Sequence, residues 1–192
     1  MENAMRISDR ISYFNPKDRE AGALLQADLI RRIQMQKKDS QQVVVLCVGT
    51  DRATGDCLGP LVGHQLMTSS YYKVFGTLSQ PVHAGNLTQT MAEIYRSFRE
   101  PFVIAIDACL GSADHVGYVT VSSMPLFPGQ GVDKELPPVG DISITGIVNF
   151  TSETNFNTIQ TTRLHTVMEL SSYIACGVED SVRYFAKHAA TT

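Results

Sequence analysis

Apolar residues along the chain follow two patterns, one typical of buried strands and one of helices. An apolar run with three consecutive valines ends at Gly49, and a second run, 102–106, leads directly into Asp107. Short apolar runs rich in β-branched residues indicate strands buried on both faces of a sheet. In residues 18–38, leucine and isoleucine instead recur at helical spacing, with acids early and bases late. The chain thus predicts buried strands that alternate with amphipathic helices.

The rest of the chain continues this alternation. Helices are expected at about 58–70, at 87–98 with Asn86 as N-cap, and at 155–188 with an interruption near Gly177. Further strands are expected at 72–75, 116–121 and 141–148. Residues 122–138 contain four prolines and two glycines, which predicts a long loop.

This order of elements predicts an α/β fold, a three-layer α/β/α sandwich with a mostly parallel central sheet. A length of 192 residues fits a single domain. Within it we expect an N-terminal helix at about 18–38, a core at about 40–150 and C-terminal helices at about 155–188.

Composition narrows the classes of function. Hydrophobic residues make up 43% of the chain and charged residues 18%, which indicates a folded globular protein. A net charge of -3 does not indicate the basic surface that nucleic-acid binding requires. No apolar segment has the roughly 20 residues of a membrane span, and the N-terminus lacks the apolar core of a signal peptide. We therefore expect a cytoplasmic protein without nucleic-acid or membrane partners; a homo-oligomer stays open.

Two carboxylates stand where buried strands are expected to end. Asp56 lies in the loop after the first strand, and Asp107 follows the 102–106 run. Ligands of open α/β sheets bind outside the carboxyl ends of the strands. If the two carboxylates face each other, their repulsion separates their pKa values, and one can act as acid while the other stays ionised. Two structural roles compete: Asp56 as the N-cap of the following helix, and Asp107 satisfied by loop N–H groups.

Other polar residues near these positions are weaker candidates. Asp51 has the surroundings of a turn residue and is a reserve carboxylate, and His83 is placed to reach the same crevice from the next strand end. Cys57 and Cys109 are interpreted as small buried hydrophobic residues rather than nucleophiles. The four cysteines have no metal-binding spacing and are expected to be free thiols, so neither a disulfide framework nor a structural zinc site is expected.

Three segments resemble the spore germination protease family and, more closely, its short YyaC-type relatives, a domain of unknown function connected with sporulation. They are the stretch 49–60 with its Asp-Cys-Leu-Gly-Pro sequence, the stretch 104–108 around Asp107, and the Pro-Gly-Gln-Gly-Val sequence at 128–132 followed by 141–149. Residues 88–90 and 93–94 resemble the helix before the second aspartate strand. The resemblance covers roughly residues 40–150.

The resemblance implies an atypical peptidase, neither serine nor cysteine, that acts on protein or peptide substrates through Asp56 and Asp107. Its proline-glycine loop adds Gly129 and Gly131 to Asp51 and His83 as binding candidates. The family's substrates are small acid-soluble spore proteins, and the resemblance therefore leads us to expect the protein in the sporulating cell or spore.

The resemblance also implies a fold shared with hydrogenase-maturation endopeptidases, which bind a metal through carboxylates and a histidine. The third ligand would fall at 143–146, where this chain has no histidine. No cofactor is expected; a divalent metal, if present, would use Asp56, Asp107 and His83. Three hypotheses follow: a peptidase-like hydrolase, a catalytically silent protein that binds a partner, and a metal-dependent maturation endopeptidase.

Overall fold

The computed structural model describes residues 11–128, 136–152 and 155–189, with the side chains of 155–157 and 188–189 left undescribed. Its centre is a six-stranded sheet with the strand order β1-β5-β6-β4-β2-β3. The strands are β1 (Ile11–Phe14), β2 (Val43–Cys47), β3 (Lys73–Phe75), β4 (Phe102–Gly111), β5 (Val119–Ser122) and β6 (Ile142–Phe150). The four strands β6-β4-β2-β3 are parallel, whereas β5 and β1 join antiparallel at one edge.

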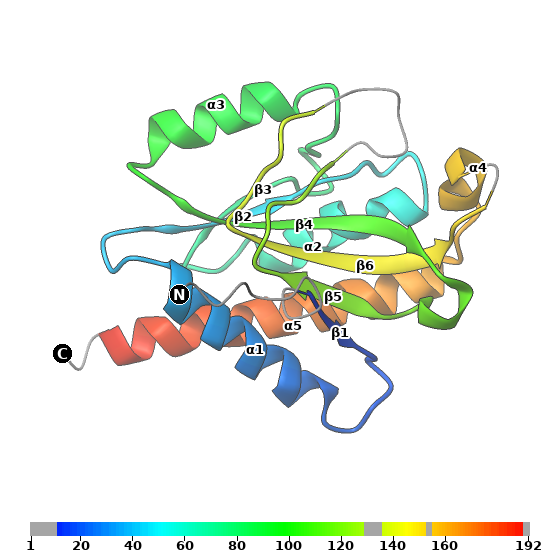
Figure 1. Cartoon of the computed structure of the whole chain (residues 1–192). Helices are drawn as coiled ribbons and strands as arrows, with labels where there is room; N and C mark the ends of the chain where they lie inside the picture. The colour runs from blue at the N-terminus through cyan, green and yellow to red at the C-terminus, as the bar shows by residue number, and fades with distance from the viewer. Residues whose placement is uncertain (1–10, 129–135, 153–154, 190–192) are drawn as a thin grey trace, which may run out of the picture.

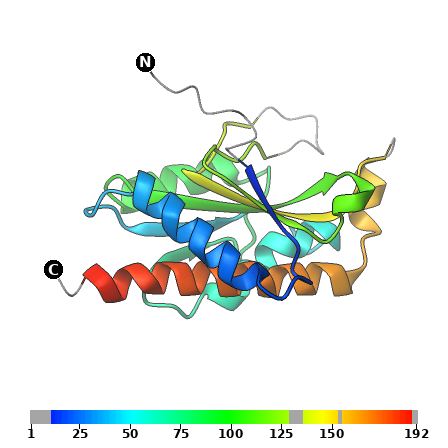
Figure 2. The ribbon, with the colours of Figure 1, turned by 60° about the horizontal axis from the view of Figure 1, so that its bottom comes forward.

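Helices cover both faces of this sheet (Figure 1). The α-helices are α1 (Ala21–Gln36), α2 (Leu58–Leu66), α3 (Leu87–Ser97), α4 (Asn155–Gln160) and α5 (Leu164–Ala189), with short 3-10 turns η2 (Gly55–Cys57) and η3 (Ala113–His115). Helices α1, α2 and α5 pack on one face, where Figure 2 shows α1 and α5 side by side, and α3 packs on the other. The predicted α/β fold with three layers is therefore confirmed. None of the helices in the described residues is long and apolar enough to span a membrane.

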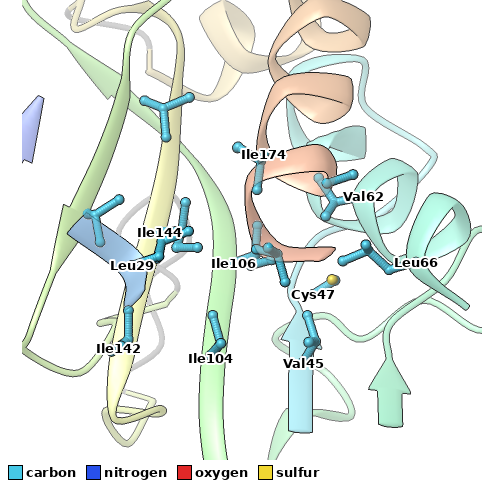
Figure 3. Packing of buried hydrophobic residues seen from close by; sticks show 14 of the residues in the cluster. Leu29, Val45, Cys47, Val62, Leu66, Ile104, Ile106, Ile142, Ile144 and Ile174 are labelled. Carbon is cyan, nitrogen blue, oxygen red and sulfur yellow. The ribbon is translucent and has the colours of Figure 1, made fainter. Parts of the chain in front are cut away.

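Alternating residues of β4 supply the two hydrophobic cores. Phe102, Ile104 and Ile106 face the core shared with α1, α2 and α5, which Figure 3 shows in close view. Val103 and Ala105 face the smaller core under α3. Side chains of successive strand residues point to opposite faces, so the apolar run of β4 lies between two layers of helices.

Strand β1 was not predicted, and a buried arginine explains where it sits. Arg32 of α1 is 1% exposed and forms an ion pair with Asp28, with Nε and Oδ2 2.6 Å apart. Its guanidinium also donates to the hydroxyls of Ser12 in β1, at 2.8 Å, and Ser123, at 2.7 Å. A buried charge needs such partners. The arginine therefore connects α1 with β1 and with the segment that follows β5.

Strand β4 is longer than predicted. It was expected to end at Ile106, but β6 runs alongside it and pairs with it as far as Gly111. Asp107 therefore lies inside a strand and not directly after one, and the expectation of a strand end at this residue is wrong. Its other neighbour, β2, does end here: the last pair between β2 and β4 joins Cys47 to Ile106.

Two helix details also differ from the prediction. Helix α5 continues through Gly177, so the predicted interruption is absent. The glycine instead allows α1 to pack closely, because a Cβ at this position would lie 2.5 Å from Leu25 Cδ2 of α1. Asn86 occupies the N-cap position of α3 without a capping hydrogen bond. Its Oδ1 instead accepts the N–H of His83 at 2.8 Å, and its amide donates to the Pro81 carbonyl.

The predicted long loop is partly ordered by an antiparallel bridge between Leu126 and Val139. Both residues are buried in the core under α3. Gly129 and Gly131, the binding candidates of this loop, lie outside the described residues.

Candidate functional site

Asp56 lies in the 3-10 turn η2, which leads directly into α2. The chain leaves the sheet at Gly49, whose φ of 139° is strained for other residues and whose N–H donates to the Val82 carbonyl at 2.7 Å. It then folds back, so that the N–H of Thr50 donates to the main-chain oxygen of Asp56 at 3.1 Å. A Cβ on Gly49 would lie 2.0 Å from this same oxygen. Glycine at 49 is therefore a condition for the position of Asp56.

The structural role considered for Asp56 does not apply. The N-cap position of α2 is Cys57, and neither η2 nor α2 has a side-chain capping hydrogen bond. The carboxylate of Asp56 is partly buried and is not used to begin the helix.

Asp107 points to the face of the sheet on which Val103 and Ala105 lie. Its Oδ1 accepts the N–H of Ala108 at 2.7 Å. The side chain is partly buried, and its partner across the ladder is Thr145 of β6. A single local N–H is less than the set of loop N–H groups that the structural role for Asp107 would require.

The charge of Asp56 affects the pKa of Asp107. Burial raises the pKa of Asp107 well above its ordinary value, and the charge of Asp56 raises it further, while the Ala108 N–H opposes both. Burial also raises the pKa of Asp56, opposed by the Thr50 N–H and by His83. Burial and the neighbouring charge both favour the neutral form of Asp107, which makes Asp107 the candidate for the protonated member of the pair. The pair can present one protonated and one ionised carboxyl group.

A row of hydroxyls lies beside Asp107 on the same face of the sheet. The Cys109 thiol donates to Thr145 Oγ1 at 3.3 Å, and Thr145 Oγ1 is 2.6 Å from Thr120 Oγ1 of β5. Sequence reasoning did not identify these residues. The available signal was the alternation of Ser143 and Thr145 with isoleucines in the strand predicted at 141–148.

The remaining candidates lie at the margin. His83 is exposed, and its Nδ1 accepts the N–H of Gly85 at 3.1 Å. Asp51 is exposed. Burial raises the pKa of the Cys57 thiol, and the charges of Asp51 and Asp56 raise it further. Burial also raises the pKa of Cys109. A catalytic thiol needs a lowered pKa, so both cysteines have the wrong electrostatics for a nucleophile.

Neither metal nor disulfide chemistry has an assembled site in the part of the chain that the structure describes. No group of three or more His, Cys, Asp or Glu side chains there is arranged to hold a metal ion, so Asp56, Asp107 and His83 do not form a ligand set. All four cysteines are free, as predicted. The residues present therefore do not fit the two-carboxylate, one-histidine metal site that the resemblance implies.

A cavity of about 580 Å³ lies elsewhere, between the C-terminal end of α2 and α5. Gln65, Ser69, Tyr71, Cys176 and Glu179 are among its lining residues. Since Asp56 precedes the other end of α2, this cavity contains neither carboxylate of the candidate site.

Comparisons with known proteins identify the family of this chain. The chain is 44% identical over 161 residues to the uncharacterized protein YyaC of Bacillus subtilis (strain 168), covering 83% of this chain and 78% of that protein. Among solved structures, it is similar to the [NiFe] hydrogenase maturation protease HycI from Thermococcus kodakarensis KOD1, with a TM-score of 0.45 and 13% identity over 78% of this chain and 97% of that chain. The family model described as "Protein of unknown function (DUF1256)" matches residues 13–177, and the chain belongs to this family.

Proposed function

We propose that this protein is a peptidase-like hydrolase that uses Asp56 and Asp107 to activate a water molecule on a peptide bond. The observation that carries the proposal is the upward shift of the Asp107 pKa by burial and by the charge of Asp56. Two carboxyl groups that share a site and titrate at separate pH values are a recurring arrangement for acid–base hydrolysis. Perturbed pKa values gather at functional sites, which supports a catalytic role for this pair.

The protonated role goes to Asp107, because burial and the charge of Asp56 both favour its neutral form. Asp56, the ionised member, accepts a proton from the water molecule as the water oxygen attacks the peptide carbonyl carbon. Asp107, the protonated member, donates its proton to the carbonyl oxygen as the tetrahedral intermediate forms. When the C–N bond breaks, the proton held by Asp56 moves to the leaving nitrogen, and a hydroxyl of the intermediate returns a proton to Asp107 as the carbonyl re-forms. The products are a carboxylic acid and an amine, and both aspartates regain their starting protonation. All groups in this scheme belong to the chain itself, and no step requires a metal.

The test is cleavage of fluorescein-labelled, unfolded casein by the full chain. Asp56→Asn and Asp107→Asn should each reduce the rate by at least about a thousandfold, because each removes one acid–base partner. Asp51→Asn should stay within about threefold of the wild type, because this exposed residue lies at the margin of the site. The rate of the wild type should follow a bell-shaped pH profile. Full activity in both variants at the paired positions would contradict the proposal.

Two other outcomes would indicate the other hypotheses. Heat in a nickel or zinc titration that Asp56→Asn abolishes would favour a metal-dependent endopeptidase. A stoichiometric partner that co-purifies from sporulating cells and stays bound after loss of both aspartates would favour the partner-binding hypothesis. A role in sporulation is supported by the family resemblance, and protein levels in growing and sporulating cells test it.

A further inference from the structure

The distal half of β4, residues 107–111, has a strand on only one side. On the side of β6, pairing continues to Gly111. On the side of β2, pairing ends at Ile106, and no strand in the described residues pairs with β4 beyond this point. Figure 1 shows β4 and β6 running on side by side towards α4. Burial changes at the same residue: the five residues from Phe102 are buried, and the five from Asp107 are partly exposed.

Strand β2 does not continue along this part of β4. After the last β2–β4 pair, the N–H of Val48 still donates to the Ile106 carbonyl at 2.7 Å. In a continuing strand the N–H of Thr50 would face β4 again, but it donates instead to the main-chain oxygen of Asp56 at 3.1 Å, because the chain folds back after Gly49. The line of β2 therefore ends beside Asp107, and the chain does not continue along β4.

The direction of the main-chain groups of β4 can be worked out from these bonds. Phe102 donates its N–H, and Ile106 offers its carbonyl, to the β2 side. In a parallel ladder both groups of one residue point to the same side, and the side alternates along the strand. The N–H and carbonyl of Ala108 therefore also point to the β2 side, into the space where a next strand would lie.

In this structure the Ala108 N–H is satisfied by the carboxylate of Asp107, at 2.7 Å. The bond is local, between neighbouring residues, and places Asp107 Oδ1 on the open side of the strand. A carbonyl of an added strand could accept the Ala108 N–H in place of Asp107. The carboxylate of Asp107 would then be free to act on the bound chain. An unpaired strand edge is a ready template for another extended chain.

We propose that an extended, unfolded segment of the polypeptide substrate pairs with residues 107–111 of β4 as an added strand, accepting the Ala108 N–H and lying across Asp107 and Asp56. The inference rests on the proposed function and names its substrate class: unfolded chain, recognised mainly through its backbone. Addition of a strand gives affinity through main-chain hydrogen bonds and leaves little demand on side chains. It also holds the substrate carbonyls in a fixed register next to the two carboxylates.

The test is a binding experiment with the Asp56→Asn variant of the full chain, so that cleavage does not consume the probe. The probe is fluorescein-labelled α-lactalbumin, reduced and carboxymethylated to keep it unfolded, and native α-lactalbumin is the folded control. We expect anisotropy to show binding of the unfolded form only. Adding Ala108→Pro, which removes the N–H, should weaken binding at least tenfold. Equal binding of both forms would overturn the inference.

Ala113→Pro is the matched control for the proline substitution. Ala113 is exposed at the first residue of η3, and the residue before it is extended, as proline requires. This variant should bind within twofold of its parent. Hydrogen exchange in the Asp56→Asn variant gives a second readout that needs no proline: the probe should slow exchange of the Ala108 amide. Unchanged exchange, or equal effects of both prolines, would overturn the inference.

Casein cleavage by Ala108→Pro, without the Asp56→Asn substitution, distinguishes a failure of this inference from a failure of the proposed function. Casein cleavage that Ala108→Pro leaves unchanged would retain the hydrolase and reject strand addition. Binding that depends on Ala108, with no cleavage by the wild type, would retain strand addition and reject the hydrolase.

Discussion

The two halves of β4 contain the same number of residues but have opposite surroundings. Phe102 to Ile106 lies between β2 and β6 and is covered on both faces, whereas Asp107 to Gly111 has β6 alone and is partly exposed. The first half is apolar throughout, and the second begins with a carboxylate whose pKa burial raises. The strand thus combines a stabilising segment with a segment whose polar group is held at a cost in stability.

The difference shows how a rigid sheet can position reactive groups. The proximal half fixes the strand through side chains that are almost completely buried. The distal half takes its position from this anchor and from β6, so it can carry Asp107 without contributing much to the core. Sites placed on regular elements keep their geometry better than sites placed on loops. Asp56, which lies in a turn, needs the special backbone of Gly49 instead.

The largest expected change in the free energy of unfolding comes from comparing one side chain in each half of β4. Ile106→Ala should lower the free energy of unfolding by about 2 to 5 kcal/mol, because Ile106 is fully buried and leaves a cavity. Leu110→Ala should cost about 1 kcal/mol, since Leu110 is only partly buried against the same core. Urea unfolding of both variants measures the difference. Equal losses would show that the two halves of β4 contribute alike.

The next effect concerns the turn that carries Asp56. Gly49→Ala should cost about 2 to 4 kcal/mol, because it combines a strained φ with a Cβ placed 2.0 Å from the Asp56 carbonyl oxygen. Gly117→Ala is the control: its φ is 90°, but a Cβ there meets nothing within 4 Å, so strain alone should cost about 1 kcal/mol. Thermal unfolding compares the two. Similar melting temperatures would remove the proposed requirement for glycine at 49.

The sequence was most informative where local pattern and tertiary environment agree. The apolar runs of β2 and β4 predicted buried parallel strands, and the two strands do pair in parallel, from Val43 with Phe102 to Cys47 with Ile106. The predicted end of β4 was wrong because Asp107 interrupts the apolar run and residues 107–111 contain no β-branched residue. Their strand conformation comes from β6, a partner 38 residues further along in the pair of Asp107 with Thr145.

Two other differences have the same origin in long-range contacts. Strand β1 is only four residues long, and the hydrogen bond from Arg32 to Ser12 holds it in place. No local sequence pattern predicts this bond. Gly177 was interpreted as a helix interruption, but it is the place where α5 approaches Leu25 of α1. A glycine in a helix has the same appearance in the sequence in both cases.

A smaller effect, of opposite sign, is expected at Asp107. Its pKa in the folded state lies above the ordinary 3.8, so the folded protein binds this proton more tightly than the unfolded chain. Stability from this group is therefore lost as pH rises from about 4 through the folded-state pKa. Asp107→Asn should be more stable than the wild type at pH 7 by about 0.5 to 2 kcal/mol. The advantage should vanish below pH 4.

Urea unfolding at several pH values measures this dependence. Asp39→Asn serves as the control because Asp39 is exposed, and its effect should stay within about 0.5 kcal/mol at every pH. An Asp107→Asn variant that is less stable than the wild type at pH 7 would mean that the carboxylate is held by favourable contacts and is not strained by burial.

The smallest effect concerns the hydroxyl row beside Asp107. Thr145→Val keeps the shape of the side chain but removes the oxygen that accepts from Cys109 and contacts the Thr120 hydroxyl. Loss of these bonds should cost about 1 kcal/mol in urea unfolding, the usual net value of a hydrogen bond. Thr120→Val is the matched control, because it removes only the bond at the far end of the row, and it should cost less. If Thr145→Val instead cost as much as Ile106→Ala, the distal half of β4 would depend on its polar contacts for stability, and the contrast between an anchoring half and a functional half would fail.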